Sequence, residues 1–199
     1  MDQPRLLIAT HNRGKLIEYQ EMFAGLPFAL VTLDEVGIRD DVDETGATFA
    51  ENAALKATTY ARRSGLLTLA DDSGLQVDAL GGEPGVRSKR YAAGGDAARN
   101  EFLLSQLRDV PASKRAARFR CAIAICSPTG TLWETEGTCE GEIAFAPRGT
   151  NGFGYDPIFH VAERGVRMAE LTTAEKNRVS HRAHAAAGAK RILALLAQT

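Results

Sequence analysis

The chain of 199 residues is 44% hydrophobic and carries a formal net charge of −1, a composition that is ordinary for a globular protein. This charge balance creates no overall positive field, so it argues against nucleic acid and acidic membranes as partners. No apolar run approaches the roughly 20 residues of a membrane-spanning helix, and the first residues lack the pattern of a signal peptide. The three cysteines form no CxxC pair, which favours reduced thiols. We therefore expect a cytoplasmic protein that binds neither nucleic acid nor membrane.

The first part of the chain alternates between strand and helix patterns. Short apolar runs predict buried strands, and apolar residues at helical spacing predict the helices between them. Thr48 and Glu51 have the spacing of a capping box, in which a hydroxyl and a carboxylate accept free amides at a helix start. The predicted elements are a strand over 5–10, a helix over 15–23, a strand over 29–33, and a helix from 48 to Ser64 that ends at Gly65.

The second part is richer in strand patterns and predicts an α/β fold with a long mixed sheet and flanking helices. Thr172 and Glu175 form a second capping box, which opens a helical region near the end of the chain. Before it we predict strands over 66–70 and 76–80, a glycine-rich loop over 81–95, a helix over 96–107 capped by Asp96, a strand over 118–126, a hairpin in preference to one strand over 132–145, and irregular structure over 149–157.

The segment THNRGK, residues 10–15, joins a predicted strand to a predicted helix. A helix start offers free amides and the positive end of the helix dipole, which suit a phosphate group. Asn12 can cap the helix, Gly14 permits close approach, and Lys15 adds a charge. The segment is not a Walker loop, because the earlier glycine and the hydroxyl residue are missing. It is a candidate phosphate site, and a plain turn with a solvated lysine is the alternative.

The segment ADDSG, residues 70–74, ends a predicted strand with two adjacent carboxylates. Ligands of open α/β sheets lie at this end of the strands, and two carboxylates ionise together most easily beside a cation such as Mg²⁺. The alternative is a polar turn in which Asp72 bonds its own backbone. The acidic segment DDVDETG, residues 40–46, either supplies a further carboxylate to the same cation or is a solvated loop.

The segment GFGYD, residues 152–156, places glycines on both sides of an aromatic residue. Such a tight loop can present a ring for stacking on a base, with Asp156 as a polar contact. A turn with core aromatic residues explains the same pattern.

The segment EKNRVSHR, residues 175–182, carries three donors in Lys176, His181 and Arg182. Residues six apart cannot share one face of a continuous helix. Because Ser180 is a good N-cap, we expect a break over 177–180 and a new helix that begins at His181. The alternative is one amphipathic helix with basic residues on its solvated side.

Five motifs in this order resemble the inosine triphosphate pyrophosphatase family, also called non-canonical purine NTP pyrophosphatases or XTP/dITP diphosphatases. The resemblance runs from Leu6 to about Leu195, as one inosine-triphosphatase-like domain over 1–199, and its motifs are ATHNRGK, ETGATFAENAALKA, ADDSGLQVDALGGEPGVRSKRYA, GTNGFGYDPIF and ELTTAEKNRVSHR. It implies two lobes around a deep cleft, a homodimer, and Mg²⁺-dependent hydrolysis of ITP, dITP and XTP to the monophosphate and pyrophosphate. The implied role is to clear deaminated purines from the nucleotide pool.

The resemblance also implies roles for individual residues. Asp72 matches the family's catalytic aspartate, which is also described as a metal ligand, and Phe153 would stack on the base. The implied substrate contacts are Thr10, His11, Asn12, Arg13, Gly14 and Lys15 for the triphosphate, Ser73 beside the catalytic aspartate, Phe153, Gly154, Tyr155 and Asp156 for the base, and Lys176, His181 and Arg182 to read the base and orient the nucleotide.

Two positions depart from the family pattern. The family's metal-binding glutamate aligns with Asp43, which is one carbon shorter, and the neighbouring Glu44 is the alternative ligand. His11 stands where many relatives carry glycine, and a positive φ there would strain it.

Two other functions fit parts of the sequence. A non-catalytic nucleotide sensor could use the same phosphate loop and base pocket, but it would not need paired carboxylates at the phosphate end. A house-cleaning pyrophosphatase for modified pyrimidine nucleotides would release pyrophosphate from those substrates in preference to ITP.

Overall fold

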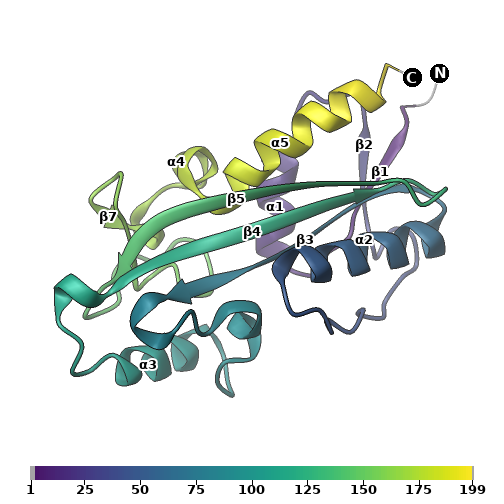
Figure 1. Cartoon of the computed structure of the whole chain (residues 1–199). Coiled ribbons are helices and arrows are strands. Elements are labelled where there is room, and N and C mark those ends of the chain that lie inside the picture. Colours follow the sequence, from purple (N-terminus) through teal and green to yellow (C-terminus); the bar gives the residue numbers. More distant parts are fainter. Residues whose placement is uncertain (1–2, 199) are drawn as a thin grey trace. The chain divides into compact units, whose positions relative to one another are not determined.

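The computed structural model describes residues 3–198, in which seven strands form one mixed sheet with helices beside it (Figure 1). The strand order is β2-β1-β3-β4-β5-β6-β7. The chain forms two compact units. The first unit comprises the chain up to Asp72, Cys121–Gly137 and the segment from Arg182 onward, and the second comprises Ser73–Arg120 and Thr138–His181.

The first unit has a parallel arrangement of strands at its centre. β1 pairs in parallel with both β2 and β3, so that Leu6 lies opposite Leu30 on one side and Leu67 on the other. The elements that lie wholly or partly in this unit are β1 (Arg5–Ile8), α1 (Arg13–Met22), β2 (Ala29–Thr32), α2 (Phe49–Ser64), the first part of β3 (Leu67–Val77), the end of β4 (Ala116–Cys126), the beginning of β5 (Leu132–Ile143), and α5 (His181–Leu196).

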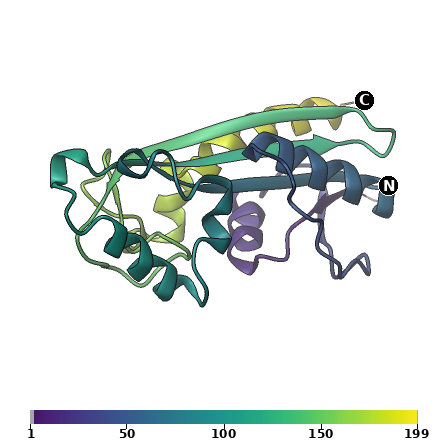
Figure 2. The same cartoon turned by 60° about the horizontal axis from the view of Figure 1, so that its bottom comes forward.

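The helices of the first unit cover both faces of its strands. Leu6 and Ile8 pack with Tyr19 of α1 and with Ala189 and Leu193 of α5. The buried residues of α2, among them Ala53, Ala57 and Tyr60, do not belong to that cluster. Figures 1 and 2 show α2 and α5 on opposite sides of the strands, as the alternation of side chains along a strand requires.

The second unit has its own apolar core, in which Phe119 packs against Phe159 with ring centroids 4.5 Å apart. Its strands β5, β6 and β7 pair antiparallel. The other elements of this unit are the end of β3, η1 (Asp78–Leu80), η2 (Gly85–Arg90), α3 (Asp96–Gln106), η3 (Ala112–Lys114), the beginning of β4, the end of β5, β6 (Phe159–Val161), β7 (Val166–Arg167), η4 (Met168–Glu170) and α4 (Thr173–Val179).

Several boundaries of helices and loops lie where the sequence predicts them. Gly65 ends α2 with a φ of 68°, which glycine adopts without steric cost. Thr172 and Glu175 form the expected reciprocal capping box. α4 and α5 are separate helices, with Ser180 extended between them. The segment 149–157 contains neither helix nor strand.

Four expectations about local structure were wrong. β3 continues through both aspartates to Val77, because the backbone stays extended there, and no separate strand covers 76–80. β5 is one continuous strand, so the turn lies between the neighbouring strands β4 and β5, where Ser127 donates to the carbonyl of Thr131. Asp96 is the first residue of α3 and not its cap. Glu51 accepts the amide of Ala47, so the first capping box is only half formed.

The described residues contain no helix that is long and apolar enough to cross a membrane.

The β5–β6 pairing should be intolerant of a side chain at Gly141. An added Cβ would collide with the carbonyl oxygen of His160 and lie 2.6 Å from a ring carbon of Phe159. We expect Gly141→Ala to lower the free energy of unfolding by about 2 kcal/mol, the usual scale of overpacking. At Gly95 an added Cβ meets nothing within 4 Å, so Gly95→Ala is the matched control. Urea denaturation of both variants measures the difference, and equal stabilities would contradict the tight packing at Gly141.

Candidate functional site

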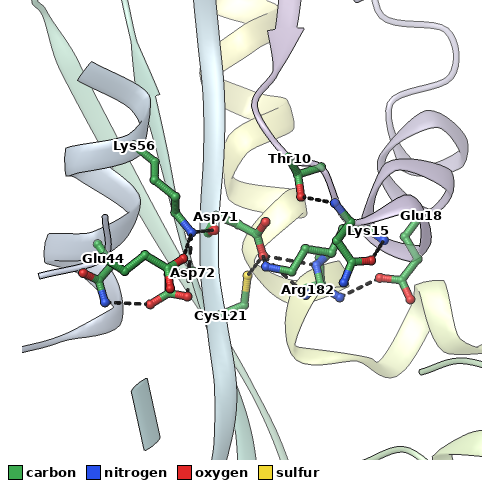
Figure 3. Close-up of polar contacts among 11 residues, drawn as sticks. Thr10, Lys15, Glu18, Glu44, Lys56, Asp71, Asp72, Cys121 and Arg182 are labelled. Atoms are coloured by element: carbon green, nitrogen blue, oxygen red, sulfur yellow. Dashed lines mark hydrogen bonds and ion pairs between the residues drawn. The ribbon is translucent and has the colours of Figure 1, made fainter. Parts of the chain in front are cut away.

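The two adjacent aspartates of β3 point to opposite faces of the strand (Figure 3). Successive side chains of an extended strand alternate in this way. Asp72 points toward α2, where Asn52 and Lys56 lie, and Asp71 points toward α1 and α5. The pair therefore does not form one carboxylate cluster, and each aspartate has its own partners.

Asp72 is held by two side chains from consecutive turns of α2. Asn52 donates to Asp72 Oδ2 at 3.0 Å and accepts the amide of Gly46 at 2.8 Å. Lys56 Nζ lies 3.8 Å from Asp72 Oδ1 and donates to the carbonyl of Asp71 at 2.7 Å. Asn52 thus links the acidic connection before α2 to the predicted catalytic carboxylate.

Glu44 is the residue of the acidic connection that faces this group. Its Oε1 accepts Lys56 Nζ at 2.7 Å, with only 22% of the side chain exposed. Asp43 is exposed. Of the two predicted alternatives, the geometry brings Glu44 into the group of Asp72 and Lys56.

The charges in this group shift the pKa values of its members. Burial raises the pKa of Asp72 above its usual value, and the positive charges of Lys56 and Lys15 oppose that shift without cancelling it. Burial alone would lower the pKa of Lys56, but the carboxylates of Asp72, Asp71 and Glu44 raise it overall. Lys56 therefore stays charged at neutral pH between two carboxylates.

The donor set of Glu44 and Asp72 fits a magnesium ion. Among residues 3–198 no group of three or more His, Cys, Asp or Glu side chains is arranged to hold a metal. Mg²⁺ commonly uses one or two protein carboxylates and takes its other ligands from water and substrate phosphates. Two carboxylates that already share one cation, Lys56, match that requirement.

Asp71 is the centre of a buried group of opposite charges on the other face of β3 (Figure 3). Its Oδ2 lies 2.9 Å from Lys15 Nζ and 3.3 Å from Arg182 Nη2. Arg182 Nη1 donates to Glu18 Oε2 at 2.6 Å, and the arginine is only 1% exposed. Two acids and two bases from α1, β3 and α5 thus neutralise one another inside the first unit.

The environment of Asp71 keeps it ionised. Burial would raise its pKa, but the charges of Lys15, Arg182 and Lys56 lower it well below the usual value. Cys121 Sγ lies 3.7 Å from Asp71 Oδ2, and burial followed by the charge of Asp71 raises the pKa of that thiol. Cys121 is therefore a neutral, unreactive thiol.

The predicted phosphate segment begins α1 as expected. Thr10 Oγ1 accepts the amide of Asn12, and Asn12 Oδ1 caps the helix by accepting the amide of Lys15 at 3.1 Å. Arg13 is exposed, Gly14 is half-buried, and His11 Nε2 lies 3.8 Å from Asp41 Oδ1. Among the described residues every positive φ belongs to glycine, so His11 carries no such strain.

In the second unit the predicted base loop is built around Asp156. Lys176 Nζ donates to Asp156 Oδ2 at 2.6 Å, and both side chains are 4% exposed. The same oxygen accepts the amide of Phe153 at 3.0 Å, and Lys176 Nζ lies 4.5 Å from the centre of the Phe153 ring. Gly152 must be glycine, because an added Cβ would collide with Asp156 Oδ2.

The remaining predicted residues of the second unit are placed by separate contacts. The hydroxyl of Tyr155 donates to the carbonyl of Ser88 at 2.9 Å. The buried ring of His181 stacks on Phe119, with centroids 4.7 Å apart. Ser73 is half-buried in β3. Arg182 belongs to the first unit, whereas Lys176 and His181 belong to the second.

The predictions from sequence missed three polar residues, the buried Glu18 and Asn52 and the half-buried Lys56. A signal was present for two of them. Phe49, Asn52, Lys56 and Tyr60 recur at helical spacing, which puts two polar residues on the apolar stripe of α2. A polar residue at a core position calls for a buried partner, and that partner is Asp72.

Comparison with known proteins finds close similarity over almost the whole chain. The model of the Ham1 family matches residues 6–192. A dITP/XTP pyrophosphatase of Geobacter sulfurreducens is 51% identical over 185 residues, which cover 92% of this chain and 93% of that protein. One of Bacillus licheniformis is 47% identical over 97% of this chain and 98% of its own length. The solved structure of a HAM1 protein from Coxiella burnetii has a TM-score of 0.87 and 42% identity, and covers 96% of this chain and 98% of that one.

Removal of the Asp71 charge should destabilise the protein strongly. Asp71→Asn leaves the buried Arg182 and the half-buried Lys15 with one carboxylate fewer, and loss of one partner of a buried ion pair typically costs about 3–5 kcal/mol. The control is Asp78→Asn, because Asp78 pairs with Arg118 but is exposed, and exposed ion pairs contribute little to stability. Urea denaturation measures both. A loss at Asp71 no greater than at Asp78 would show that the buried group is not needed for stability.

Proposed function

The chain belongs to the Ham1 family, and we propose that it hydrolyses dITP, XTP and ITP to the monophosphate and pyrophosphate. This reaction would remove deaminated purines from the nucleotide pool. By the same relationship we propose a cytoplasmic homodimer. The observation that carries the proposal is the buried carboxylate of Asp72, which Asn52 orients and Lys56 and Glu44 surround.

The reaction needs a nucleophile at the α-phosphorus. We propose that Asp72 accepts a proton from a water molecule whose oxygen bonds to this phosphorus, while the bond to the bridging oxygen breaks. Pyrophosphate then leaves with the electrons of that bond. Because burial raises the pKa of Asp72, its carboxylate is a better proton acceptor than an exposed aspartate.

Positive charge must offset the charge that develops on the phosphates. Lys56 and Lys15 can supply it, together with the amides at the start of α1. Glu44 and Asp72 would hold Mg²⁺, which supplies Lewis-acid stabilisation of phosphate oxygens when it is bound. Asn52 donates to Asp72 Oδ2 and so orients the carboxylate that would accept the proton.

The residues of the second unit suit a purine base. Phe153 can stack on the base, and Asp156 and Lys176 fix the direction of its ring. The 6-keto group of hypoxanthine and xanthine accepts hydrogen bonds, which a donor such as His181 can provide. Facing the 6-amino group of ATP, such a donor would be left unpaired, and sites of this kind discriminate by roughly 10⁴-fold or more.

The reaction can be tested by pyrophosphate release from dITP, XTP, dGTP and dATP, with Mg²⁺ and with EDTA. We expect Mg²⁺-dependent turnover of dITP and XTP, and a loss of about a hundredfold or more in kcat for Asp72→Asn, because a general base typically contributes at least that much. Full activity of Asp72→Asn would show that another carboxylate acts as the base. Turnover of modified pyrimidine triphosphates alone would refute the purine assignment, and no turnover of any nucleotide would indicate a sensor.

The choice between Glu44 and Asp43 as metal ligand can be tested separately. We expect Glu44→Gln to raise the Mg²⁺ concentration for half-maximal activity by about tenfold or more, the scale on which residues near a metal alter its affinity. Asp43→Asn should change it by less than about twofold, because Asp43 is exposed. The reverse pattern in the magnesium titration would assign the ligand to Asp43.

A further inference from the structure

We propose that Asp96 and Asn100 of α3 are positioning residues that hold Gly154, and through it the ring of Phe153, in the geometry that binds the nucleobase. This inference rests on the proposed function, because it takes Phe153 as the stacking residue. Neither Asp96 nor Asn100 belongs to the motifs that predicted the base site.

The two side chains bind the two ends of the same residue. Asp96 Oδ2 accepts the amide of Gly154 at 2.6 Å, and Asn100 Nδ2 donates to the carbonyl of Gly154 at 3.1 Å. Residues at i and i+4 of a helix lie on one face, so one turn of α3 holds both polar groups of this glycine.

These two hydrogen bonds restrain Gly154, a residue type with a flexible backbone. Gly154 has a φ of 64°, and an added Cβ there would meet nothing within 4 Å. Glycine loses more conformational freedom on folding than any other residue, so a glycine beside the stacking ring would leave that ring poorly oriented unless it is held. The contacts from α3 supply that restraint.

The hydrogen bonds from α3 to Gly154 complement the hydrogen bond between Asp156 and Phe153. The amide of Phe153 donates to Asp156 Oδ2 at 3.0 Å, and the next amide along the chain, that of Gly154, donates to Asp96. Two carboxylates from different elements thus hold the peptide groups on both sides of Phe153. The ring is then fixed before substrate arrives, which reduces the ordering cost of binding.

Asp96 and Asn100 contact Gly154 and do not cap the start of α3. The cap residue of α3, Gly95, makes no side-chain bond to the helix start, although the neighbouring Asp96 is a residue type suited to capping. Arg99 pairs with Asp96 Oδ1 and donates to the carbonyl of Gly94, while Asp96 Oδ2 accepts the amide of Gly154. Asn100 is 6% exposed, and within the described residues its Oδ1 has no hydrogen-bond partner. An amide that leaves half of its capacity unused is not placed for helix stability.

The variants Asp96→Ala and Asn100→Ala test the inference through steady-state kinetics with dITP. We expect each to raise KM about tenfold with kcat changed less than about threefold, because the chemistry at Asp72 is untouched. Asp96→Asn keeps an acceptor oxygen for the amide of Gly154 and should restore most of the loss. Glu101→Gln, at an exposed position of the same helix, is the control and should match the wild type.

Two further measurements separate positioning from stability and from the proposed function. Amide hydrogen exchange of Gly154 should accelerate in Asp96→Ala while the core strands keep their protection. A lower kcat at unchanged KM would overturn the inference, because a smaller folded fraction of enzyme lowers only the apparent kcat. Unchanged hydrogen exchange at the amide of Gly154 would also overturn it. If the wild type is active and both alanine variants match it, the inference fails and the proposed function stands. If the wild type turns over neither dITP nor XTP, both fail.

Discussion

The first unit depends on the way in which β3 places two adjacent negative charges in separate environments. Alternation along the strand sends Asp71 and Asp72 to opposite faces, so each needs its own compensation. An uncompensated buried charge costs several kcal/mol, which is a large fraction of the stability of a protein of this size. α1 and α5 supply Lys15 and Arg182 on one face, and α2 supplies Lys56 on the other. The packing of three helices on this strand is thereby tied to a pattern of charges as well as to apolar contacts.

The second unit solves a similar problem at Asp156 by a different route. There one lysine and one backbone amide share a single carboxylate oxygen, and the glycines of the loop let the chain turn closely around it. Asp96 likewise accepts the next amide of the same loop, that of Gly154. Carboxylates in this unit therefore shape a backbone segment, whereas Asp71 in the first unit joins whole elements. A loop held at consecutive amides keeps its shape without regular secondary structure.

The family, the mixed sheet with its helices and several helix boundaries were predictable, because motifs and local signals indicate them. The cap at Asn12, the stop at Gly65 and the break at Ser180 depend on residues within one turn of the boundary. The length of β3 was not predictable in this way. Two adjacent aspartates indicate a turn when only their sequence neighbours are considered, and their charges are neutralised here by partners far along the chain. For the same reason the association of Lys15 with Arg182, which are 167 positions apart, could not be read from the chain. The sequence left Asp43 and Glu44 as alternatives, because reach depends on the path of an irregular segment.

The opposite pKa shifts of the two aspartates give them different chemical roles. Asp71, beside Lys15 and Arg182, is held ionised and cannot take up a proton near neutral pH. Asp72 is one residue away, yet burial raises its pKa despite Lys56, so proton uptake costs it less. Pairs of acids whose surroundings separate their pKa values in this manner commonly divide the work of a site, one as a fixed charge and the other as a proton acceptor. Because alternation along a strand alone sets which neighbours each acid meets, a one-residue shift in the register of β3 would exchange the two environments. The register of β3 against β1 therefore determines the candidate chemistry as well as the fold.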